Sequence, residues 1–198
     1  VLAALGAAEA LDVDRDQALA GAAAVHAIPG RLQRVGDDRE LHAFVDYAHT
    51  EEALRQVLGF LREVGADPLT CVVGCGGDRD RTKRPRMASV AARLSDRAVF
   101  TSDNPRTEDP EQILDDMFTG LVDAELRQKS ARIPDRRTAI RRAVVDAPVG
   151  ATVLVAGKGH ERYQIVGTER LPFDDVTEVE AALEQRQRAS GPASGSRQ

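Results

Sequence analysis

Four short polar segments of this chain carry side chains suited to binding a charged ligand, and each directly follows an apolar run. They are residues 46–50, 74–86, 103–106 and 157–161. In the second segment, Gly74, Gly76 and Gly77 precede seven charged side chains. Glycine lets a ligand approach the main chain closely, and a strand, a glycine turn and a helix start form anion sites in open α/β sheets. The alternative is a solvent-exposed loop whose charges pair with one another.

The third segment offers the groups that a free amino acid requires. It consists of Asp103, Asn104, Pro105 and Arg106. An arginine guanidinium binds a carboxylate through two parallel hydrogen bonds, and aspartate and asparagine oxygens accept hydrogen bonds from an ammonium group. This set predicts a site for a zwitterionic amino acid. The alternative is a capping turn in which Arg106 pairs with Glu108 or Asp109.

The first segment places a carboxylate, a phenol and an imidazole at the end of an apolar run. These side chains, Asp46, Tyr47 and His49, are of the right types to hold a ribose and an adenine. The residues alone favour a simpler interpretation, in which Asp46 accepts hydrogen bonds from backbone amides where a helix begins.

The fourth segment resembles half of a phosphate-binding loop. It has glycines on both sides of Lys158 but lacks the spacing of a nucleotide P-loop. Glu161 is a candidate for binding a second ammonium group, and His160 is expected to make a structural hydrogen bond. Neither a Ser–His–Asp set nor a pair of catalytic carboxylates is recognisable in the chain.

Alternating strand and helix patterns indicate how these segments are positioned. Residues 32–35 and 41–45 predict a hairpin, and buried strands are predicted at 70–73, 98–100 and 152–156. Helical patterns lie between the strands, so we expect an α/β fold with a doubly wound, mostly parallel sheet. The carboxyl ends of parallel strands share one edge, which is where such sheets bind ligands. The four polar segments are therefore expected to meet there.

The two ends of the chain are expected to differ from this central part. Residues 1–25 are alanine-rich and helical, and the breaker at Pro29 and Gly30 predicts a domain boundary. We assign residues 1–28 to the end of a neighbouring domain whose start is missing, and residues 29–186 to the main domain. Residues 127–137 are expected to be a basic connection. The tail, residues 187–198, is rich in Ser, Gly and Pro and is expected to be disordered.

Composition excludes several classes of protein. The net charge is −5 and the basic residues are local, which argues against a general nucleic-acid-binding protein. No run approaches the roughly 20 apolar residues of a membrane span. Cys71 and Cys75 are the only cysteines and make a poor metal site, so we expect no metal ligands here and a reducing, cytoplasmic location.

The four segments, in this order and with these residues, closely resemble the C-terminal part of the Mur ligases. The resemblance is greatest for the branch that extends UDP-N-acetylmuramoyl-L-alanyl-D-glutamate by one amino acid, and it covers nearly the whole chain except the tail. It implies a Rossmann-like C-terminal domain preceded by helices of a truncated central ATPase domain. It further implies a monomeric, cytoplasmic enzyme of peptidoglycan synthesis that uses ATP and Mg²⁺.

The resemblance also assigns residues to two sites. Those matching the ATP site are Arg31, Asp46, Tyr47 and His49. Those matching the amino-acid site are Arg79, Asp103, Asn104, Pro105, Arg106, Gly157 and Glu161. Family members that use lysine generally lack the arginine of the Asn-Pro-Arg turn, so the implied amino acid is meso-diaminopimelate.

The family's ATP loop and magnesium ligands are not found in this sequence. We therefore expect the chain to be folded but inactive alone, with no catalytic residue identifiable in it. Two alternatives remain open. One is a related Mur or folylpolyglutamate-type ligase, and the other is a non-catalytic module that binds an amino acid or a nucleotide.

Overall fold

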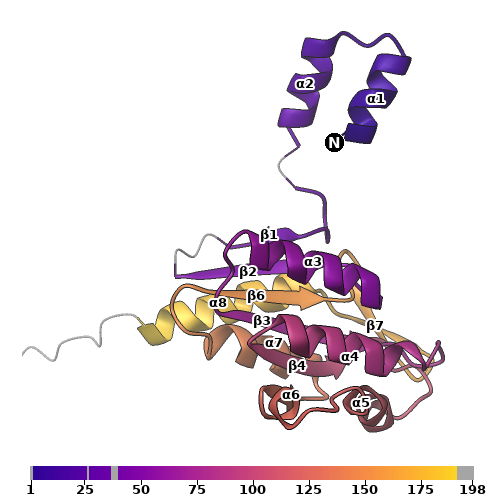
Figure 1. Ribbon diagram of the computed structural model, residues 1–198, viewed down its shortest axis with the longest axis vertical. Coiled ribbons are helices and arrows are strands. Elements are labelled where there is room, and N and C mark those ends of the chain that lie inside the picture. The colour runs from indigo at the N-terminus through magenta and orange to yellow at the C-terminus, as the bar shows by residue number, and fades with distance from the viewer. Residues whose placement is uncertain (1, 26, 37–39, 191–198) are drawn as a thin grey trace, which may run out of the picture.

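The computed structural model describes residues 2–25, 27–36 and 40–190 of the 198-residue chain. Among these residues, six strands form one sheet (Figure 1). In spatial order they are β1 (Gln33–Val35), β2 (Leu41–Asp46), β6 (Ala151–Ala156), β3 (Leu69–Cys75), β4 (Arg97–Ser102) and β5 (Ser130–Arg132). Only β1 is antiparallel to its neighbour, which confirms the predicted hairpin and the mostly parallel sheet.

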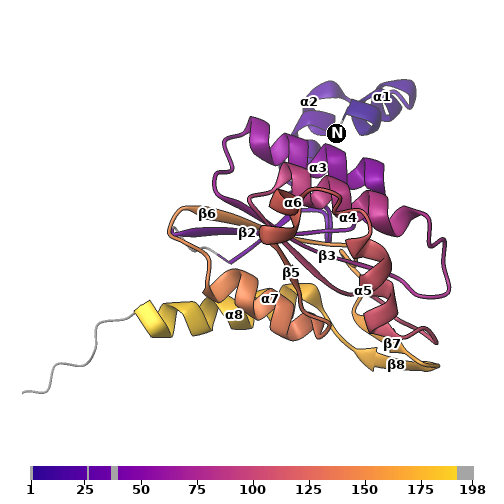
Figure 2. The same cartoon turned by 60° about the horizontal axis from the view of Figure 1, so that its bottom comes forward.

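Helices cover both faces of this sheet, as Figure 2 shows. One face carries α3 (Glu51–Glu63), α4 (Lys83–Leu94), α5 (Pro110–Phe118) and α6 (Ala124–Gln128). The other face carries α7 (Arg136–Val145) and α8 (Asp175–Ser190). Each layer has its own apolar core against the sheet, so the fold is doubly wound, as the alternating pattern predicted.

Local sequence explains why the central elements form where they do. Thr50 caps α3, and its hydroxyl accepts a hydrogen bond from Ala53 N at 3.2 Å. Leu54, Leu58 and Leu61 then form a stripe at helical spacing that is buried against the sheet. All residues of β3 and β6 are buried, because helices cover these strands on both faces.

Two boundaries differ from the sequence expectations. The basic connection expected at 127–137 contains the end of α6, all of β5 and the first residues of α7. Short elements of three to five residues give too little periodicity to be recognised. The last helix continues to Ser190, so residues 187–190, which were expected to belong to a disordered tail, are helical. The remainder of that tail, 191–198, lies outside the described residues.

The first two helices, α1 (Leu2–Ala10) and α2 (Arg15–Ala23), project away from the sheet (Figure 1). Neither helix contains a buried residue, and Leu2 and Leu11 are 86% and 76% exposed.

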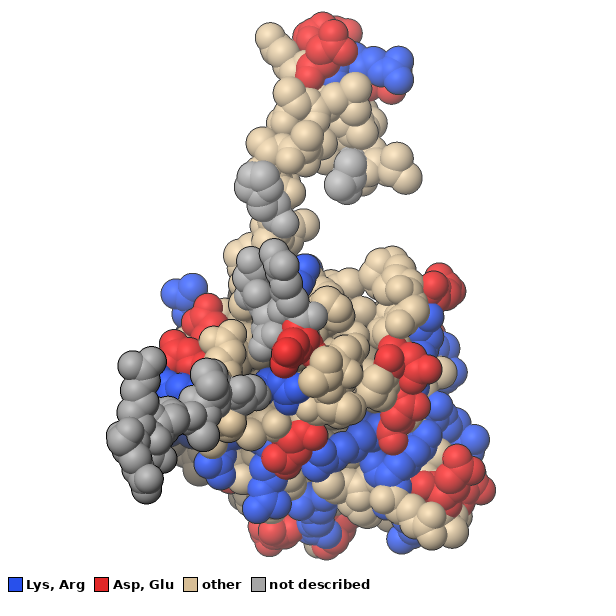
Figure 3. Space-filling view, turned by 90° about the vertical axis from the view of Figure 1, so that its left-hand side faces the viewer, with Lys and Arg blue, Asp and Glu red and all other residues tan. Residues whose placement is uncertain are grey.

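On the face in Figure 3, basic and acidic side chains lie side by side over the sheet domain, whereas the projecting helix pair is mostly uncharged. None of the helices that the structure describes is long and apolar enough to cross a membrane.

A separate hairpin lies beyond the arrowhead of β6 (Figure 1). Its strands are β7 (Tyr163–Val166) and β8 (Glu169–Pro172), which pair antiparallel. Residues 163–166 have the pattern of a short strand and Gly167 that of a turn, whereas nothing in the sequence indicates the pairing with β8. This hairpin matters for the site because it contacts the loop that follows β4.

Candidate functional site

The carboxyl ends of the parallel strands bring the four polar segments together. Asp46 at the end of β2 pairs with Ala156 at the end of β6, which in turn pairs with Val73 of β3. Cys75 at the end of β3 pairs with Ser102 at the end of β4. The segments beginning at 46, 74, 103 and 157 therefore share one edge of the sheet, as the strand pattern predicted.

One part of this edge is a close contact between two glycine turns. Gly30 has φ +66° and Gly159 has φ +54°, and a Cβ on Gly30 would overlap the backbone nitrogen of His160. Only glycine permits both the left-handed backbone and this close approach. The contact places the loop after Pro29 directly against the 157–161 loop.

An aromatic cluster forms over this contact. The Tyr47 ring lies 4.6 Å from the His49 ring and 5.2 Å from the His160 ring, measured between centroids. The Arg31 guanidinium carbon is 4.7 Å from the Tyr47 centroid. Three of the four residues expected at an ATP site are thus adjacent. His160, expected to make a structural hydrogen bond, joins the cluster instead.

Asp46, the fourth of these residues, fixes the backbone around the cluster. Its Oδ2 accepts a hydrogen bond from Leu32 N at 2.6 Å, and its Oδ1 accepts one from Ala48 N at 2.8 Å. This is the simpler interpretation that the residues alone favoured. Because the first bond crosses to the segment that carries Arg31, Asp46 also positions that side chain.

The loop after β4 holds Arg106 in an unusual conformation. Its φ is +52°, a left-handed value that costs a non-glycine residue free energy. The hairpin stabilises it, because Arg106 N donates to Ile165 O at 3.0 Å and Gly167 N donates to Arg106 O at 2.7 Å. Its side chain is held by a hydrogen bond from Nη1 to Gly77 O at 2.8 Å.

The rest of the Arg106 guanidinium is available. Within the described residues, Nε and Nη2 make no hydrogen bond, and no carboxylate forms an ion pair with this side chain. The alternative in which Arg106 pairs with Glu108 or Asp109 is wrong. Glu108 binds Arg84, and Asp109 caps α5 through Glu111 N.

Asn104 links this loop to the loop after β6. Its Oδ1 accepts hydrogen bonds from Lys158 Nζ at 2.9 Å and from Ile165 N at 2.9 Å. Its Nδ2 donates to Glu161 Oε2 at 3.2 Å. Both lone pairs of the amide oxygen are therefore used, and none remains for a substrate ammonium. The Asn104 amide thus orients the Glu161 carboxylate through Oε2. In the part of the chain that the structure describes, the other oxygen of that carboxylate, Oε1, remains available for a substrate group.

The remaining expected residues lie around the same edge. Asp103 is mostly buried, with Oδ1 3.1 Å from Lys158 Nζ, and its carbonyl oxygen accepts from Gln164 Nε2. Gly157 N donates to Asp46 O at 3.0 Å, which joins the two halves of the edge. Pro105 is buried. Gly77 packs so closely against the Pro105 carbonyl that a Cβ on Gly77 would overlap it.

Most cations of the charge cluster of 78–86 are paired, but with carboxylates outside the segment, so the alternative in which the charges of this loop pair with one another is wrong. Arg81 and Arg84 both bind Asp116, and Arg86 lies 3.7 Å from Glu51. Among the described cations of the cluster, Arg79 and Lys83 have no carboxylate partner. Arg79 is exposed and donates only to Asp78 O, and Lys83 donates to His49 O.

The buried side chain of Arg84 holds the 74–86 segment against the helix layer. Its side chain is completely buried, and it forms two hydrogen bonds to the Glu108 carboxylate at 2.8 and 2.9 Å, one to Asp116 and one to Gly76 O. Hydrogen bonding from Arg84 lowers the pKa of Glu108 to about 2. Sequence reasoning missed this anchor, because Arg84 was one of many cations in a polar segment.

A second buried arginine supports the edge from the opposite face. Arg136, at the start of α7, forms two hydrogen bonds to Asp175, at 2.8 and 2.6 Å, and both side chains are fully buried. It also donates to the carbonyl oxygens of Ser102 and Ala156, at the ends of β4 and β6. The strand ends that carry the loops are therefore held from both sides of the sheet.

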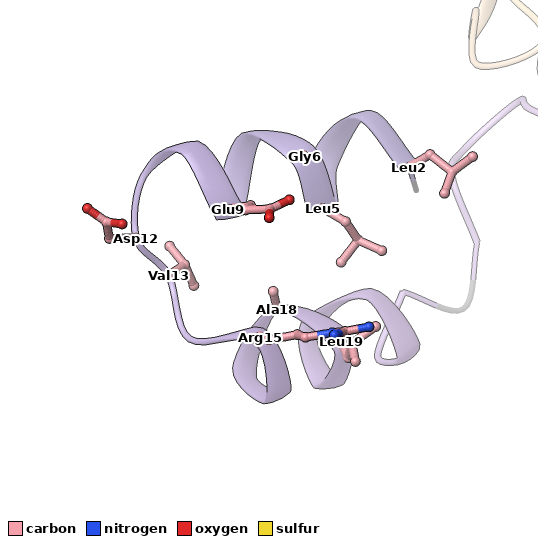
Figure 4. Close-up of a pocket in the computed structure, with 9 residues that line it drawn as sticks. All are labelled: Leu2, Leu5, Gly6, Glu9, Asp12, Val13, Arg15, Ala18 and Leu19. Carbon is pink, nitrogen blue, oxygen red and sulfur yellow. The ribbon is translucent and has the colours of Figure 1, made fainter.

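A hollow elsewhere in the chain does not belong to this edge. It has a volume of about 720 Å³ and lies between α1 and α2, with Leu5 pointing across from α1 (Figure 4). None of the expected site residues lines it. No group of three or more His, Cys, Asp or Glu side chains suited to a metal ion occurs in the described part of the chain.

Comparison with known proteins identifies relatives of this chain. A family model described as "Mur ligase, glutamate ligase domain" matches residues 30–159. A protein of Gloeobacter violaceus named UDP-N-acetylmuramoyl-L-alanyl-D-glutamate–2,6-diaminopimelate ligase is 48% identical over 187 residues. That match covers 94% of this chain but only 38% of the relative.

Solved structures give the same result for the fold. The structure of a UDP-N-acetylmuramoyl-L-alanyl-D-glutamate–2,6-diaminopimelate ligase matches 94% of this chain, and 38% of its own, with a TM-score of 0.75 and 45% identity. The UDP-N-acetylmuramate–alanine ligase of Thermotoga maritima matches with a TM-score of 0.62 at 14% identity, which shows a shared fold alone. It covers 94% of this chain and 36% of its own.

Proposed function

This chain belongs to the Mur ligase family, and on that premise we propose that it forms the amino-acid-binding part of an ATP-dependent ligase. The proposed reaction joins meso-diaminopimelate to UDP-N-acetylmuramoyl-L-alanyl-D-glutamate. The relative that is 48% identical carries the name of that activity. Because this chain spans about 38% of that relative's length, the activity is proposed for the larger protein.

The observation that carries this proposal is the available guanidinium of Arg106. meso-Diaminopimelate and L-lysine differ by one carboxylate on the distal carbon. A guanidinium held by Gly77 O, with Nε and Nη2 unbonded within the described residues, supplies a planar fork for that carboxylate. With lysine in the site, the fork would stay unpaired and partly desolvated, which is costly.

Other residues of the edge complete the amino-acid site. Glu161 accepts the distal ammonium, with Asn104 orienting its carboxylate through the 3.2 Å hydrogen bond. Arg79 is exposed, has no carboxylate partner among the described residues and binds a second substrate carboxylate. Asp103, Pro105 and Gly157 shape the walls of the site.

The aromatic cluster is the proposed contact surface for ATP. The cation of Arg31 attracts the phosphates, Tyr47 and His49 offer ring faces to the nucleoside, and Asp46 holds the loop in place. These residue types fit a nucleotide. The Mg²⁺ that accompanies ATP is proposed to be held mainly by residues of the family's ATP-binding domain, as the resemblance implies.

The chemistry implied by the family proceeds in two steps. The γ-phosphoryl group of ATP is transferred to the terminal carboxylate of the nucleotide peptide, which gives an acyl phosphate and ADP. The amine of diaminopimelate then attacks the acyl carbon, and the tetrahedral intermediate expels phosphate as the amide forms. This chain's own residues bind and orient the amine, and none is assigned as an acid or a base.

The helix pair α1 and α2 is proposed to be the end of the ATP-binding domain. The absence of buried residues in both helices and the exposed Leu2 and Leu11 indicate a face that packs against other residues. The main domain then begins near Pro29. We place the enzyme in the cytoplasm, where its nucleotide-linked substrate is available. We also propose that it acts as a monomer.

The test uses a complete ligase, made by joining this chain to the remaining part of the Gloeobacter violaceus relative. The kcat/KM values for meso-diaminopimelate and L-lysine are measured by phosphate release, in the wild type and in Arg106→Ala. Sites that bind a substrate group in this way reject an analogue lacking it by about 10⁴-fold. We expect that preference in the wild type and its loss in Arg106→Ala, but not in Arg93→Ala on the exposed side of α4.

Two results would contradict the proposal. One is a wild-type enzyme that uses lysine as well as diaminopimelate, and the other is an unchanged preference in Arg106→Ala. A joined ligase that releases no phosphate with either amino acid would favour the non-catalytic binding module.

A further inference from the structure

Lys158 is a buried cation that belongs neither to the proposed ATP contacts nor to the proposed amino-acid contacts. Its side chain is completely buried, which is rare for lysine unless its charge is paired. Its Nζ donates to Asn104 Oδ1 at 2.9 Å and to Tyr163 O at 2.8 Å. The ammonium also lies 3.1 Å from Asp103 Oδ1 and 3.6 Å from Glu161 Oε2.

These contacts make Lys158 the link between three parts of the site. It is in the loop after β6, Asn104 is in the loop after β4, and Tyr163 begins the hairpin strand β7. The same hairpin holds Arg106 in its left-handed conformation through Ile165 O. A change at Lys158 therefore reaches both Glu161 and Arg106 without touching the substrate.

Two donors, Lys158 Nζ and Ile165 N, set the orientation of the Asn104 amide. With Oδ1 accepting from Lys158 Nζ and Ile165 N, the amide nitrogen faces Glu161 Oε2. The opposite orientation would place an N–H group against these two donors and the amide oxygen against a carboxylate. Lys158 and the Ile165 N–H group together fix which atom of Asn104 faces Glu161, and Lys158 supplies the only side-chain donor of the two.

Lys158 also sets the charge balance of the site. Around the distal group of the substrate, Asp103 and Glu161 contribute two negative charges and Lys158 and Arg106 two positive charges, whereas Arg79 is assigned to the other substrate carboxylate. The distal end of diaminopimelate is a zwitterion with no net charge, which suits a balanced site. Without the Lys158 charge the same site is net negative and favours a lone ammonium, such as the side chain of lysine.

We propose that Lys158 is a positioning residue that makes this site select a zwitterionic group over a lone ammonium. It acts by orienting Asn104 and Glu161 and by balancing the two carboxylates. This inference rests on the proposed function, because it concerns the amino-acid site of the same ligase.

The experiment uses the joined ligase described above and four variants. Lys158→Met removes the charge and the hydrogen bonds, Lys158→Gln removes the charge but keeps a donor, and Lys158→Arg keeps the charge. Lys129→Met is the matched control, because Lys129 is a partly buried lysine that donates to Ser95 O, away from this edge. KM and kcat are measured separately for meso-diaminopimelate, L-lysine and ATP.

We expect selectivity to follow the charge. Loss of a charged hydrogen-bonding partner costs tenfold to a hundredfold, so Lys158→Met raises the KM for diaminopimelate by about 30-fold. Its preference for diaminopimelate over lysine falls by at least the same factor, while kcat and the KM for ATP stay within about twofold. Lys158→Gln changes the KM for diaminopimelate and the preference in the same direction but by a smaller factor. This variant tests the proposal if Lys158→Met does not fold. Lys158→Arg and Lys129→Met keep the wild-type preference.

Other outcomes overturn the proposal. If the charge-removing variants lower kcat/KM for both amino acids by one common factor, or change the KM for ATP in parallel, Lys158 has a structural role only. Failure of the proposed function is seen separately, because it would appear in the wild-type enzyme as no turnover or no preference for diaminopimelate.

Discussion

The buried Arg84 provides the sharpest prediction for the stability of the fold. We expect Arg84→Met to destabilise the chain by about 3 kcal/mol at pH 7, the lower end of the range for breaking a buried ion pair. The lower end applies because the two carboxylates that lose their partner, Glu108 and Asp116, are 21% and 22% exposed and so regain some hydration. Methionine fills most of the volume, so little of the effect comes from a cavity.

A matched substitution on the same helix serves as the control. Arg93 of α4 also binds a carboxylate, that of Asp123, but the two side chains are 54% and 57% exposed. Exposed pairs contribute less than about 1 kcal/mol, so Arg93→Met should change the free energy of unfolding by no more than that. Urea unfolding of the three proteins, followed by circular dichroism, measures the difference.

The pH dependence gives this prediction a second, independent signature. The pKa of Glu108 is about 2 in the folded chain, compared with 4.5 for an ordinary glutamate. A lowered pKa means that the stabilisation is complete above pH 4.5 and is lost as the pH falls toward 2. The difference in unfolding free energy between wild type and Arg84→Met should therefore shrink over that window. Equal destabilisation by Arg84→Met and Arg93→Met, or a difference that does not depend on pH, would show that the buried ion pairs of Arg84 do not stabilise the fold in this way.

Three further predictions concern other parts of the chain. In the joined ligase, Asp46→Ala should raise the KM for ATP about tenfold, because a charged hydrogen-bond acceptor is lost. The KM for diaminopimelate should stay unchanged, and steady-state kinetics measures both values. Burial raises the pKa of both Cys71 and Cys75 to about 12, so neither should react with iodoacetamide at pH 8 until urea unfolds the chain, as mass spectrometry would detect. Arg136→Met should destabilise by about 3–5 kcal/mol in urea unfolding, because it leaves the buried Asp175 carboxylate without its partner.

Much of the fold follows from local patterns in the sequence. Thr50 and the leucines of α3 specify a capped, amphipathic helix within a single stretch of chain. The apolar runs of β3 and β6 are buried on both faces, which is why they are continuous instead of alternating. Since strands and helices alternate, the shared edge of the four polar segments follows from general rules of sheet topology.

The pairings within the edge could not be predicted in this way. Arg84 binds a carboxylate 24 residues away, and Lys158 binds an amide 54 residues away. Such partners depend on how the loops meet in space, and nothing in the local sequence distinguishes a buried lysine from an exposed one. The same reason explains why Asn104 was expected to bind a substrate ammonium, although its oxygen is used by Lys158 and Ile165.

The most direct test of the central claim is a crystal structure of the joined ligase with meso-diaminopimelate bound. We expect the distal carboxylate to lie within about 3 Å of the Arg106 guanidinium, a normal distance for a charge-assisted hydrogen bond. We also expect the distal ammonium to contact Glu161, with the Asn104 oxygen still bound to Lys158. A distal carboxylate that contacts no atom of Arg106, or an ammonium bound to the Asn104 oxygen in place of Lys158, would contradict it.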